Sequence, residues 1–353
     1  MRIKLAILEK DQSYLNRIVA VFSTKYAEKF EIYSFTDKEI ALSTLDSSRI
    51  DVFVASDVFQ IDTAELPKKC GFAYFVDSVD VDNVNGQRAI CKFQKADLIY
   101  KQILSIYSEK ADSVSGLKLG DESSKIIAFT SIGCGAGNST MAAAAAKYLS
   151  RKHKKTLYLN LEKFGSSDSF FTAEGQFGMS DIIFALKSRK TNLSLKLESC
   201  VKQDISGVYF YSQSKIALDM HELTGDDILR LISELKLTST YDYIIIDIPF
   251  DIDTETLKIF HQMHGIVWVG NGTEISNLKI CRAFEALSIL EQNDDSPLIN
   301  RISLIYNKFS NKSSKTVGEI GLRIIGGAPR YEHASEVQIL DKLSGMEMFG
   351  KIM

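Results

Sequence analysis

Short apolar runs that end in polar residues recur along the first hundred residues of this chain. Ile3–Leu8 and Ile50–Asp57 are two such runs, and we expect each to form a strand. Between them, the sequence predicts a helix from Asp11 to about Phe30 and a second helix from Asp37 to Leu45. Strands that alternate with helices at this spacing predict a doubly wound parallel sheet.

The same alternation returns after residue 124 and predicts a second α/β domain with a mostly parallel sheet. A helix with strong helix formers is expected from Met141 to Leu149. The expected strands are Lys125–Thr130, Lys155–Glu162, Tyr241–Pro249, a run from Ile302 that is followed by the pair Asn307–Lys308, and a run from Ile324 that is followed by a proline loop over Pro329–Tyr331. The stretch Ser108–Ser124 is rich in polar and small residues, which is typical of a linker. We therefore expect a first domain over residues 1–110, a linker over 111–124 and a second domain over 125–353.

Composition narrows the class of protein. The chain has 353 residues, of which 45% are hydrophobic and 25% charged, as expected for globular domains. Its 42 basic and 45 acidic residues are nearly balanced, which disfavours broad nucleic-acid binding. The cysteines have no metal-ligand spacing and are expected to be reduced thiols: Cys70, Cys91, Cys134, Cys200 and Cys281.

The sequence also bears on location. It shows no signal-peptide pattern and no apolar stretch of 18 residues, so we expect a cytoplasmic protein with at most peripheral membrane association. The basic run Arg151–Lys155 follows the helix after residue 141, where cations complement the helix dipole. A solvated face explains this run better than a nucleic-acid contact. The tail helix starting at Glu336 is expected to be a core helix rather than a membrane anchor.

Candidate chemistry begins with the run Thr130–Thr140, which contains Gly133, Gly135 and Gly137 between an expected strand and an expected helix. Glycines there allow backbone N–H groups to approach an anion at the positive end of the helix. The match to a phosphate-binding loop is incomplete, because Asn138 stands where such loops carry a lysine. A tight strand-to-helix turn without a ligand is the alternative.

The loop has no cation of its own, since no Lys or Arg lies between Lys125 and Lys147. Losing one charge-assisted hydrogen bond costs roughly 1.5–3 kcal/mol, which weakens binding without abolishing it. Cations that stabilise a transferring phosphoryl group contribute about 10³- to 10⁵-fold in rate. We therefore expect nucleotide binding to persist, with weak or absent hydrolysis.

Acidic and polar residues end the neighbouring strands. Ser139 and Asp247 are placed to hold Mg²⁺, and Glu162 is a candidate catalytic carboxylate that could orient a water. An ordinary solvated strand end is the alternative for both acids. Asn307–Lys308 and Pro329–Arg330 follow later strands and would reach the same sheet edge, where a base or ribose can be held.

Together these motifs resemble the deviant Walker A ATPases of the ParA/MinD class. Within that class, the sequence is most similar to the TadZ/CpaE proteins of tight-adherence (Flp) pilus assembly, which carry a receiver-like domain ahead of the ATPase domain. The family motif K-G-G-x-G-K-[ST] falls on residues 133–139, so both family lysines are replaced, by Gly133 and Asn138. The resemblance implies ATP and Mg²⁺ as cofactors, with Asp247 as the Walker B aspartate and Asn307 against adenine. The cofactor-binding residues implied are Cys134, Gly135, Ala136, Gly137, Asn138, Ser139, Thr140, Asn307, Lys308, Pro329 and Arg330.

The first domain resembles a response-regulator receiver. Glu9 and Asp11 match the acidic pair after the first strand, and Lys92 or Lys95 matches the lysine after the last strand. Ser56 falls at the phosphoacceptor position, so a degenerate receiver used for docking is favoured over a phosphorylated switch.

Three functions follow from this reading. The favoured one is a nucleotide-dependent homodimer that acts as an assembly or localisation factor for a tight-adherence pilus or related secretion system. Its receiver-like domain would bind pilus or secretion assembly proteins at the cell pole or the inner face of the membrane. The alternatives are an active MinD- or ParA-like ATPase in positioning or partition, and a nucleotide-free interaction module.

Overall fold

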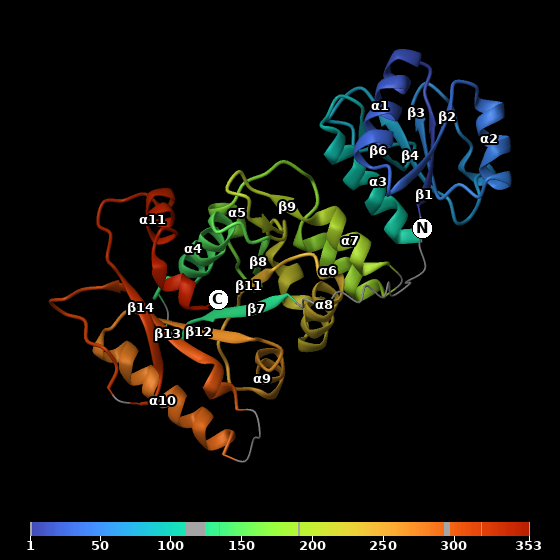
Figure 1. Cartoon of the computed structure of the whole chain (residues 1–353). Helices are drawn as coiled ribbons and strands as arrows, with labels where there is room; N and C mark the ends of the chain where they lie inside the picture. The colour runs from blue at the N-terminus through green and yellow to red at the C-terminus, as the bar shows by residue number, and fades with distance from the viewer. Residues whose placement is uncertain are drawn as a thin grey trace. The chain divides into compact units, whose positions relative to one another are not determined.

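A computed structural model describes residues 2–110, 124–133, 135–189, 191–292, 297–318 and 320–352. The chain divides into two compact units. The first consists of the described residues within Met1–Ser115 and Ser188–Cys200, and the second of those within Gly116–Lys187 and Val201–Met353. Most of the expected linker, residues 111–123, lies outside the described residues. Figure 1 shows the helices and strands of both units.

The first unit contains a six-stranded sheet in the order β2-β1-β3-β4-β6-β5. All neighbours are parallel except β5 and β6, which form an antiparallel hairpin. Its five parallel strands have the order of flavodoxin-like folds, in which ligands bind at the carboxyl ends of the first and third strands. The strands are β1 (Ile3–Leu8), β2 (Phe30–Phe35), β3 (Val52–Ser56), β4 (Gly71–Val76), β5 (Asn83–Val84) and β6 (Gln87–Cys91).

Helices cover this sheet unevenly. They are α1 (Gln12–Lys25), α2 (Lys38–Ser47), the short 3-10 helix η1 (Thr63–Glu65), α3 (Ala96–Lys110) and α7 (Leu193–Cys200). One apolar core is formed by residues of α1, α3 and the sheet, and a second by α2, the other sheet face and the β3–β4 connection. The fully described segments 57–70 and 77–86 contain no α-helix, so two crossovers lack the helix usual in such folds.

The expected helix from Asp11 to about Phe30 is too long. Asp11 caps α1 by accepting hydrogen bonds from the backbone of Ser13 and Tyr14, but the helix ends at Lys25. Phe30 instead begins β2, which pairs with β1 in register along its whole length. Parallel pairing with a buried strand therefore outweighs the local apolar periodicity of Phe30 and its preceding residues.

A segment from the middle of the second unit's sequence belongs to the first unit. Lys196 of α7 is 3% exposed, and its Nζ lies 2.8 Å from Ser105 Oγ on α3. Glu198 accepts hydrogen bonds from Tyr100 at 2.7 Å and from Lys29 at 2.8 Å. From sequence we expected residues 125–353 to lie wholly in the second domain. That expectation did not include the assignment of Ser188–Cys200 to the first unit.

The second unit contains an eight-stranded sheet in the order β14-β13-β12-β7-β11-β8-β10-β9. Among the strands in the described residues of this sheet, β9 pairs antiparallel with β10 and the other pairs are parallel. The strands are β7 (Lys125–Thr130), β8 (Thr156–Asn160), β9 (Lys202–Gln203), β10 (Tyr209–Phe210), β11 (Tyr243–Asp247), β12 (Gly265–Gly270), β13 (Ile302–Phe309) and β14 (Arg323–Pro329). The predicted fold class, two α/β domains with mostly parallel sheets, is confirmed.

Helices lie on both faces of this sheet (Figure 1). They are α4 (Asn138–Arg151), α5 (Ser167–Phe170), α6 (Met179–Ser188), η2 (Ala217–Glu222), α8 (Gly225–Thr238), α9 (Thr254–Phe260), α10 (Glu274–Leu290), η3 (Leu298–Arg301), α11 (Glu336–Leu343) and η4 (Glu347–Ile352). Within the described residues, no helix combines the length and apolarity that crossing a membrane would require.

The helix after the glycine-rich loop is buried on nearly every side. In α4, each residue from Met141 to Ala146 is 0% exposed, because small alanines let the sheet and the C-terminal segment approach closely. Leu343 of α11 and Phe349 of η4 belong to the same core, as expected for a core helix at the tail. The basic run at the end of α4 contacts this segment, with Arg151 paired to Asp341 and Lys152 to Glu347.

Candidate functional site

The glycine-rich loop joins β7 to α4 and turns sharply. Gly135 and Gly137 have φ angles of 78° and 83°, which glycine adopts without strain. A Cβ on Gly137 would also lie 2.5 Å from the Asn307 side-chain nitrogen, so only glycine fits. Gly137 caps α4 without a side-chain hydrogen bond, which leaves the first N–H groups of the helix without a capping side chain. Cys134 lies outside the described residues.

Asn138, at the position of the loop lysine, turns toward the sheet. Its side-chain nitrogen donates to Asp247 Oδ1 at 2.6 Å and to the carbonyl oxygen of Phe129 at 3.1 Å. Phe129, Asp247 and Asn160 are paired across β7, β11 and β8, so this contact forms at the carboxyl end of three adjacent strands. The neutral amide therefore replaces the charge of a lysine with a hydrogen bond inside the fold.

Asp247 is 0% exposed and lies at the centre of a polar network. Its second oxygen accepts from Tyr158 at 3.0 Å and from Asn160 at 2.9 Å. Burial, with a smaller contribution from the charge of Glu162, raises the pKa of Asp247 to about 7, although hydrogen bonds from Ser139, Tyr158 and Asn138 act in the opposite direction. The carboxylate is thus held in place by hydrogen bonds, and within the described part of the chain no Lys or Arg forms an ion pair with it.

Glu162 lies beside this network. Ser139 Oγ donates to Glu162 Oε2 at 3.2 Å, and the Glu162 backbone N–H donates to Asn160 Oδ1 at 2.9 Å. Two carboxylates therefore converge near a hydroxyl at the start of α4. Sequence analysis placed Ser139, Glu162 and Asp247 at one sheet edge, and the structure brings them together there; their roles stay predictions.

The chemistry of these groups fits Mg²⁺. Mg²⁺ prefers oxygen ligands and is usually bound through one or two carboxylates with substrate phosphates and water. Ser139 Oγ and Asp247 supply such oxygens. Among the described residues, the buried oxygens Asn138 Oδ1 and Thr130 Oγ1 have no hydrogen-bond partner. No cluster of three or more His, Cys, Asp or Glu forms a metal cage within the described chain, so the protein ligands alone would be few.

The opposite side of the loop is braced by β13. Asn307 is 4% exposed, and its side-chain nitrogen donates to the carbonyl oxygen of Ala136 at 2.8 Å. The ammonium of Lys308 donates to the carbonyl oxygen of Gly135 at 3.0 Å. Pro329 ends β14, the strand beside β13, and Arg330 is exposed just after it. The expected contacts of these four residues with a base or ribose stay predictions.

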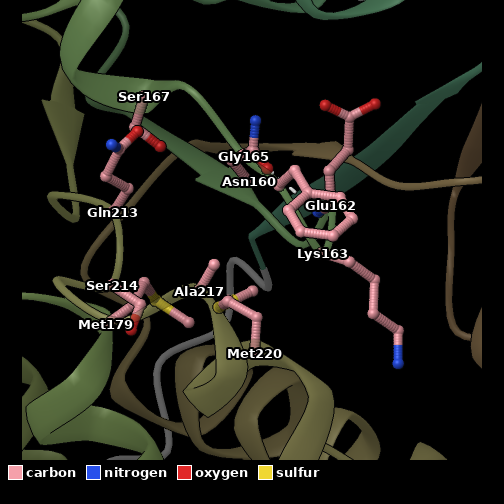
Figure 2. Close-up of a pocket in the computed structure, with 11 residues that line it drawn as sticks. Asn160, Glu162, Lys163, Gly165, Ser167, Met179, Gln213, Ser214, Ala217 and Met220 are labelled. Carbon is pink, nitrogen blue, oxygen red and sulfur yellow. Dashed lines mark hydrogen bonds between the residues drawn. The ribbon is translucent and has the colours of Figure 1, made fainter.

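A pocket opens beside the carboxylates, and sequence analysis gave no signal for it. In Figure 2, the lining residues Asn160, Glu162 and Lys163 lie together on one side of the pocket. Met179 and Met220 also line it, away from the ammonium of Lys163. Met179 and Met220 are buried, so the pocket is apolar on that side. The lining is Asn160, Glu162, Lys163, Phe164, Gly165, Ser167, Met179, Gln213, Ser214, Ala217 and Met220.

Exposed apolar side chains lie around this pocket. Phe164 is 78% exposed, and Ile216 and Leu218, on either side of the lining residue Ala217, are 60% and 73% exposed. Clusters of exposed apolar residues often mark sites where another protein binds.

The receiver-like unit has its own polar edge. The ammonium of Lys92 lies 2.7 Å from Asp77 and 3.3 Å from Glu9, which is 2% exposed. Burial acts to lower the pKa of Lys92, but these two carboxylates outweigh it and raise that pKa. Of the two lysines considered from sequence, Lys92 therefore contacts the acidic residue after β1.

The acceptor position itself is closed. Ser56 ends β3 and is 0% exposed, and within the described structure its hydroxyl has no hydrogen-bond partner. Asp57 is exposed beyond the strand end. Asp11, expected in the acidic pair, uses its carboxylate to cap α1. This edge does not present the carboxylate arrangement of a phosphorylated receiver.

Tyr158 is the residue of the network that sequence analysis missed. Tyr158 and Asn160 are two positions apart on β8, so they point to the same face of the sheet and both reach Asp247. The alternation of side chains along a strand could therefore have predicted that Tyr158 lies on the same face as Asn160. The orientation of Asn138 toward Asp247 had no local signal, because it depends on the register of β7 and β11.

Comparisons with known proteins agree with this architecture. Residues 1–108 match the family model of the TadZ-like receiver domain. The ParA family ATPase from Chlorobium tepidum TLS is similar in structure, with a TM-score of 0.51 and 20% identity over 65% of this chain and 96% of that chain. The MinD cell division protein of Aquifex aeolicus has a TM-score of 0.45 and 17% identity, over 63% of this chain and 86% of that one.

A third structure is a plasmid partition protein from Borrelia burgdorferi B31 bound to AMPPNP, with a TM-score of 0.45 and 17% identity over 65% of this chain and 100% of that chain. The search of curated proteins found no match. The chain therefore combines a segment, residues 1–108, that matches the TadZ-like receiver domain family with a second unit that has the fold of ParA-family ATPases.

Proposed function

We propose that this chain binds ATP with Mg²⁺ at the loop before α4, and that the bound nucleotide promotes a homodimer with weak or absent hydrolysis. The main support is the position of Asn138. The anion-binding features of the loop are kept, with Ser139 and Asp247 beside them, while the residue at the lysine position donates to Asp247 instead of extending toward a phosphate. Backbone N–H groups and a divalent ion would then hold the phosphates.

Slow hydrolysis follows from the same geometry. Glu162 accepts a hydrogen bond from Ser139 and has the neutral Asn160 beside it, but the loop has no cation to stabilise charge on a transferring phosphoryl group. Such cations contribute about 10³- to 10⁵-fold in rate. The site is therefore better suited to hold ATP than to cleave it.

Binding is tested by equilibrium titration with a labelled, non-hydrolysable ATP analogue, with Mg²⁺ and with EDTA. We expect saturable binding at micromolar to millimolar nucleotide that requires Mg²⁺ and is lost in Ser139→Ala. Lys258→Gln is a matched surface control, since Lys258 is exposed on α9. No Mg²⁺-dependent binding at millimolar nucleotide would favour a nucleotide-free interaction module and end the proposal.

Turnover is measured separately by phosphate release. We expect a rate close to background in the full chain, alone and with added partner proteins. A substantial rate that falls in Glu162→Ala or Asp247→Ala would instead identify an active ATPase.

The dimer is supported by the exposed apolar residues Phe164, Ile216 and Leu218 around the pocket beside Glu162. Sedimentation of the full chain with and without the Mg²⁺-bound analogue tests it. We expect the dimer fraction to rise with nucleotide and to fall in Phe164→Ser. An unchanged monomer at saturating nucleotide would contradict nucleotide-dependent dimerisation.

For the cellular role, we propose assembly or localisation of a tight-adherence pilus or related secretion system. The match of residues 1–108 to the TadZ-like receiver domain supports this, and the closed Ser56 position favours docking over phosphorylation. Purification of the full-length chain from pilus-forming cells should recover pilus assembly proteins. Normal pilus formation after deletion of its gene would contradict the role.

A further inference from the structure

Two lysines from distant elements lie against the glycine-rich loop. Lys308 follows Asn307 on β13, and its ammonium lies 3.0 Å from the carbonyl oxygen of Gly135. The Lys308 Cε would be 3.6 Å from a Cβ on Gly137, so the side chain extends along the loop. The second lysine is Lys279 of α10. Its Cδ lies 4.0 Å from the position that a Cβ on Gly133 would occupy.

Both side chains lie near loop positions where a lysine is absent. The motif comparison placed the two absent lysines at residues 133 and 138, and Lys279 lies beside Gly133. Lys308 reaches the loop at Gly135, three residues before Asn138. Sequence analysis placed Lys308 at this sheet edge, for contact with a base or ribose, and gave no signal for Lys279. The contact of Lys308 with the loop carbonyl was not expected, because 173 residues separate Lys308 from Gly135.

The negative charge expected at a nucleotide-bound site favours a role for Lys308 and Lys279 in binding phosphate. Asp247 and Glu162 place two carboxylates at the sheet edge beside the loop, and a nucleotide polyphosphate would add further negative charge. One Mg²⁺ would offset only part of that charge. Lys308 is exposed, and among the described residues its ammonium donates to one loop carbonyl oxygen, that of Gly135. An ammonium has three N–H donors, so further donors can face a phosphate oxygen.

We propose that Lys308 and Lys279 supply the positive charge for polyphosphate binding that the loop itself lacks. The inference rests on the proposed ATP-binding function and deepens it, because it assigns the phosphate-binding cations to β13 and α10. The contact of Lys308 with the loop is direct, so Lys308 should have the larger effect. Lys279 is an exposed side chain whose charge is screened more by water.

The test compares affinities for ATP, ADP and adenosine in the wild-type chain, Lys308→Gln, Lys279→Gln, the double variant and the control Lys258→Gln. Lys308→Gln should weaken ATP binding about 10-fold, and Lys279→Gln about 2- to 5-fold. Adenosine binding should change less than 2-fold, because adenosine has no phosphate. A merely structural brace would weaken all three ligands equally, which would overturn the proposal.

A second comparison guards against loss of folding. Adding Asn138→Lys to the double variant returns a cation to the loop, and should restore most of the lost ATP affinity. If wild type binds ATP and the double variant binds it equally well, this inference fails while the proposed function stands. If wild type binds no nucleotide at all, both fail.

Discussion

The carboxyl edges of the two parallel sheets differ in how their charges are balanced. In the receiver-like unit, the ammonium of Lys92 is paired with the buried carboxylate of Glu9 and with the exposed carboxylate of Asp77. In the second unit, Asp247 and Glu162 lie beside a loop without a lysine, and neutral Asn138 donates to Asp247. The buried Glu9 therefore already has a cation, whereas among the described residues no ion pair involves Asp247 or Glu162, and carboxylates of that kind can bind a divalent ion. This difference supports our proposals that the first unit is used for docking and that the second binds a nucleotide.

The largest expected effect comes from breaking the ion pair in the receiver-like unit. Lys92→Met leaves Glu9 buried without its cation and should lower the free energy of unfolding by roughly 3–5 kcal/mol. Urea unfolding of the full chain measures this effect. Glu9→Gln combined with Lys92→Met should recover most of the loss. The exposed pair Lys25–Asp97 is a matched control, and Lys25→Met should cost less than about 1 kcal/mol. Equal losses of unfolding free energy in Lys92→Met and Lys25→Met would show that the ion pair of Lys92 with Glu9 does not stabilise this edge of the sheet.

The next effect is a pH dependence in the second unit. The pKa of Asp247 is raised to about 7, so the folded chain binds a proton more tightly than the unfolded chain does. Stability contributed by this group is therefore present below about pH 4 and is lost as pH rises to about 7, by roughly 1.4 kcal/mol per pH unit at most. Unfolding free energies of wild type and Asp247→Asn should differ in slope over this range. Parallel curves would mean that Asp247 is not an unpaired buried carboxylate.

A lysine at position 138 should increase the affinity of the second unit's sheet edge for ATP. Asn138→Lys places an ammonium beside Asp247 and the phosphate cradle, and should tighten ATP binding about 10- to 100-fold, or roughly 1.5–3 kcal/mol. Equilibrium binding with Mg²⁺ measures the change. Asn138→Gln, which adds length without charge, is the control. No gain from lysine over glutamine would indicate that charge does not limit the site.

The smallest effect is expected at the receiver's acceptor position. Ser56→Ala removes a buried hydroxyl that has no partner in the described structure, and should be neutral or stabilising by up to about 1 kcal/mol. Thermal unfolding measures it. The same variant should leave the chain unmodified by acetyl phosphate, as we expect of wild type. Phosphorylation that disappears in Ser56→Ala would reveal a switch where we infer docking.

Much of this architecture was available from local sequence. Ile3–Leu8 and Lys125–Thr130 form strands with the expected bounds, because apolar runs of that length fill a buried parallel strand. The tail helix was also expected, and α11 begins at Glu336 behind a capping box at Ser335. Asp247 ends β11, which follows from an apolar run that stops at an acid.

Features that depend on contacts between residues far apart in the sequence could not be predicted from local sequence. The first helix was expected to reach about Phe30, but it ends at Lys25, and strand β2 was not predicted because it depends on pairing with β1. The inclusion of α7 in the first unit depends on contacts of Lys196 and Glu198 with residues about 90 or more positions away. The position of Lys279 beside Gly133 depends likewise on packing of α10 against the sheet, whereas Lys308 was expected at this edge without its contact to Gly135.

The most direct test of the central claim is a crystal structure of the full chain grown with Mg²⁺ and a non-hydrolysable ATP analogue. We predict a polyphosphate against the backbone N–H groups from Gly135 to Thr140, with a metal ion bound by Ser139 and close to Asp247. An empty loop at saturating nucleotide, with Asn138 still donating to Asp247, would contradict the account.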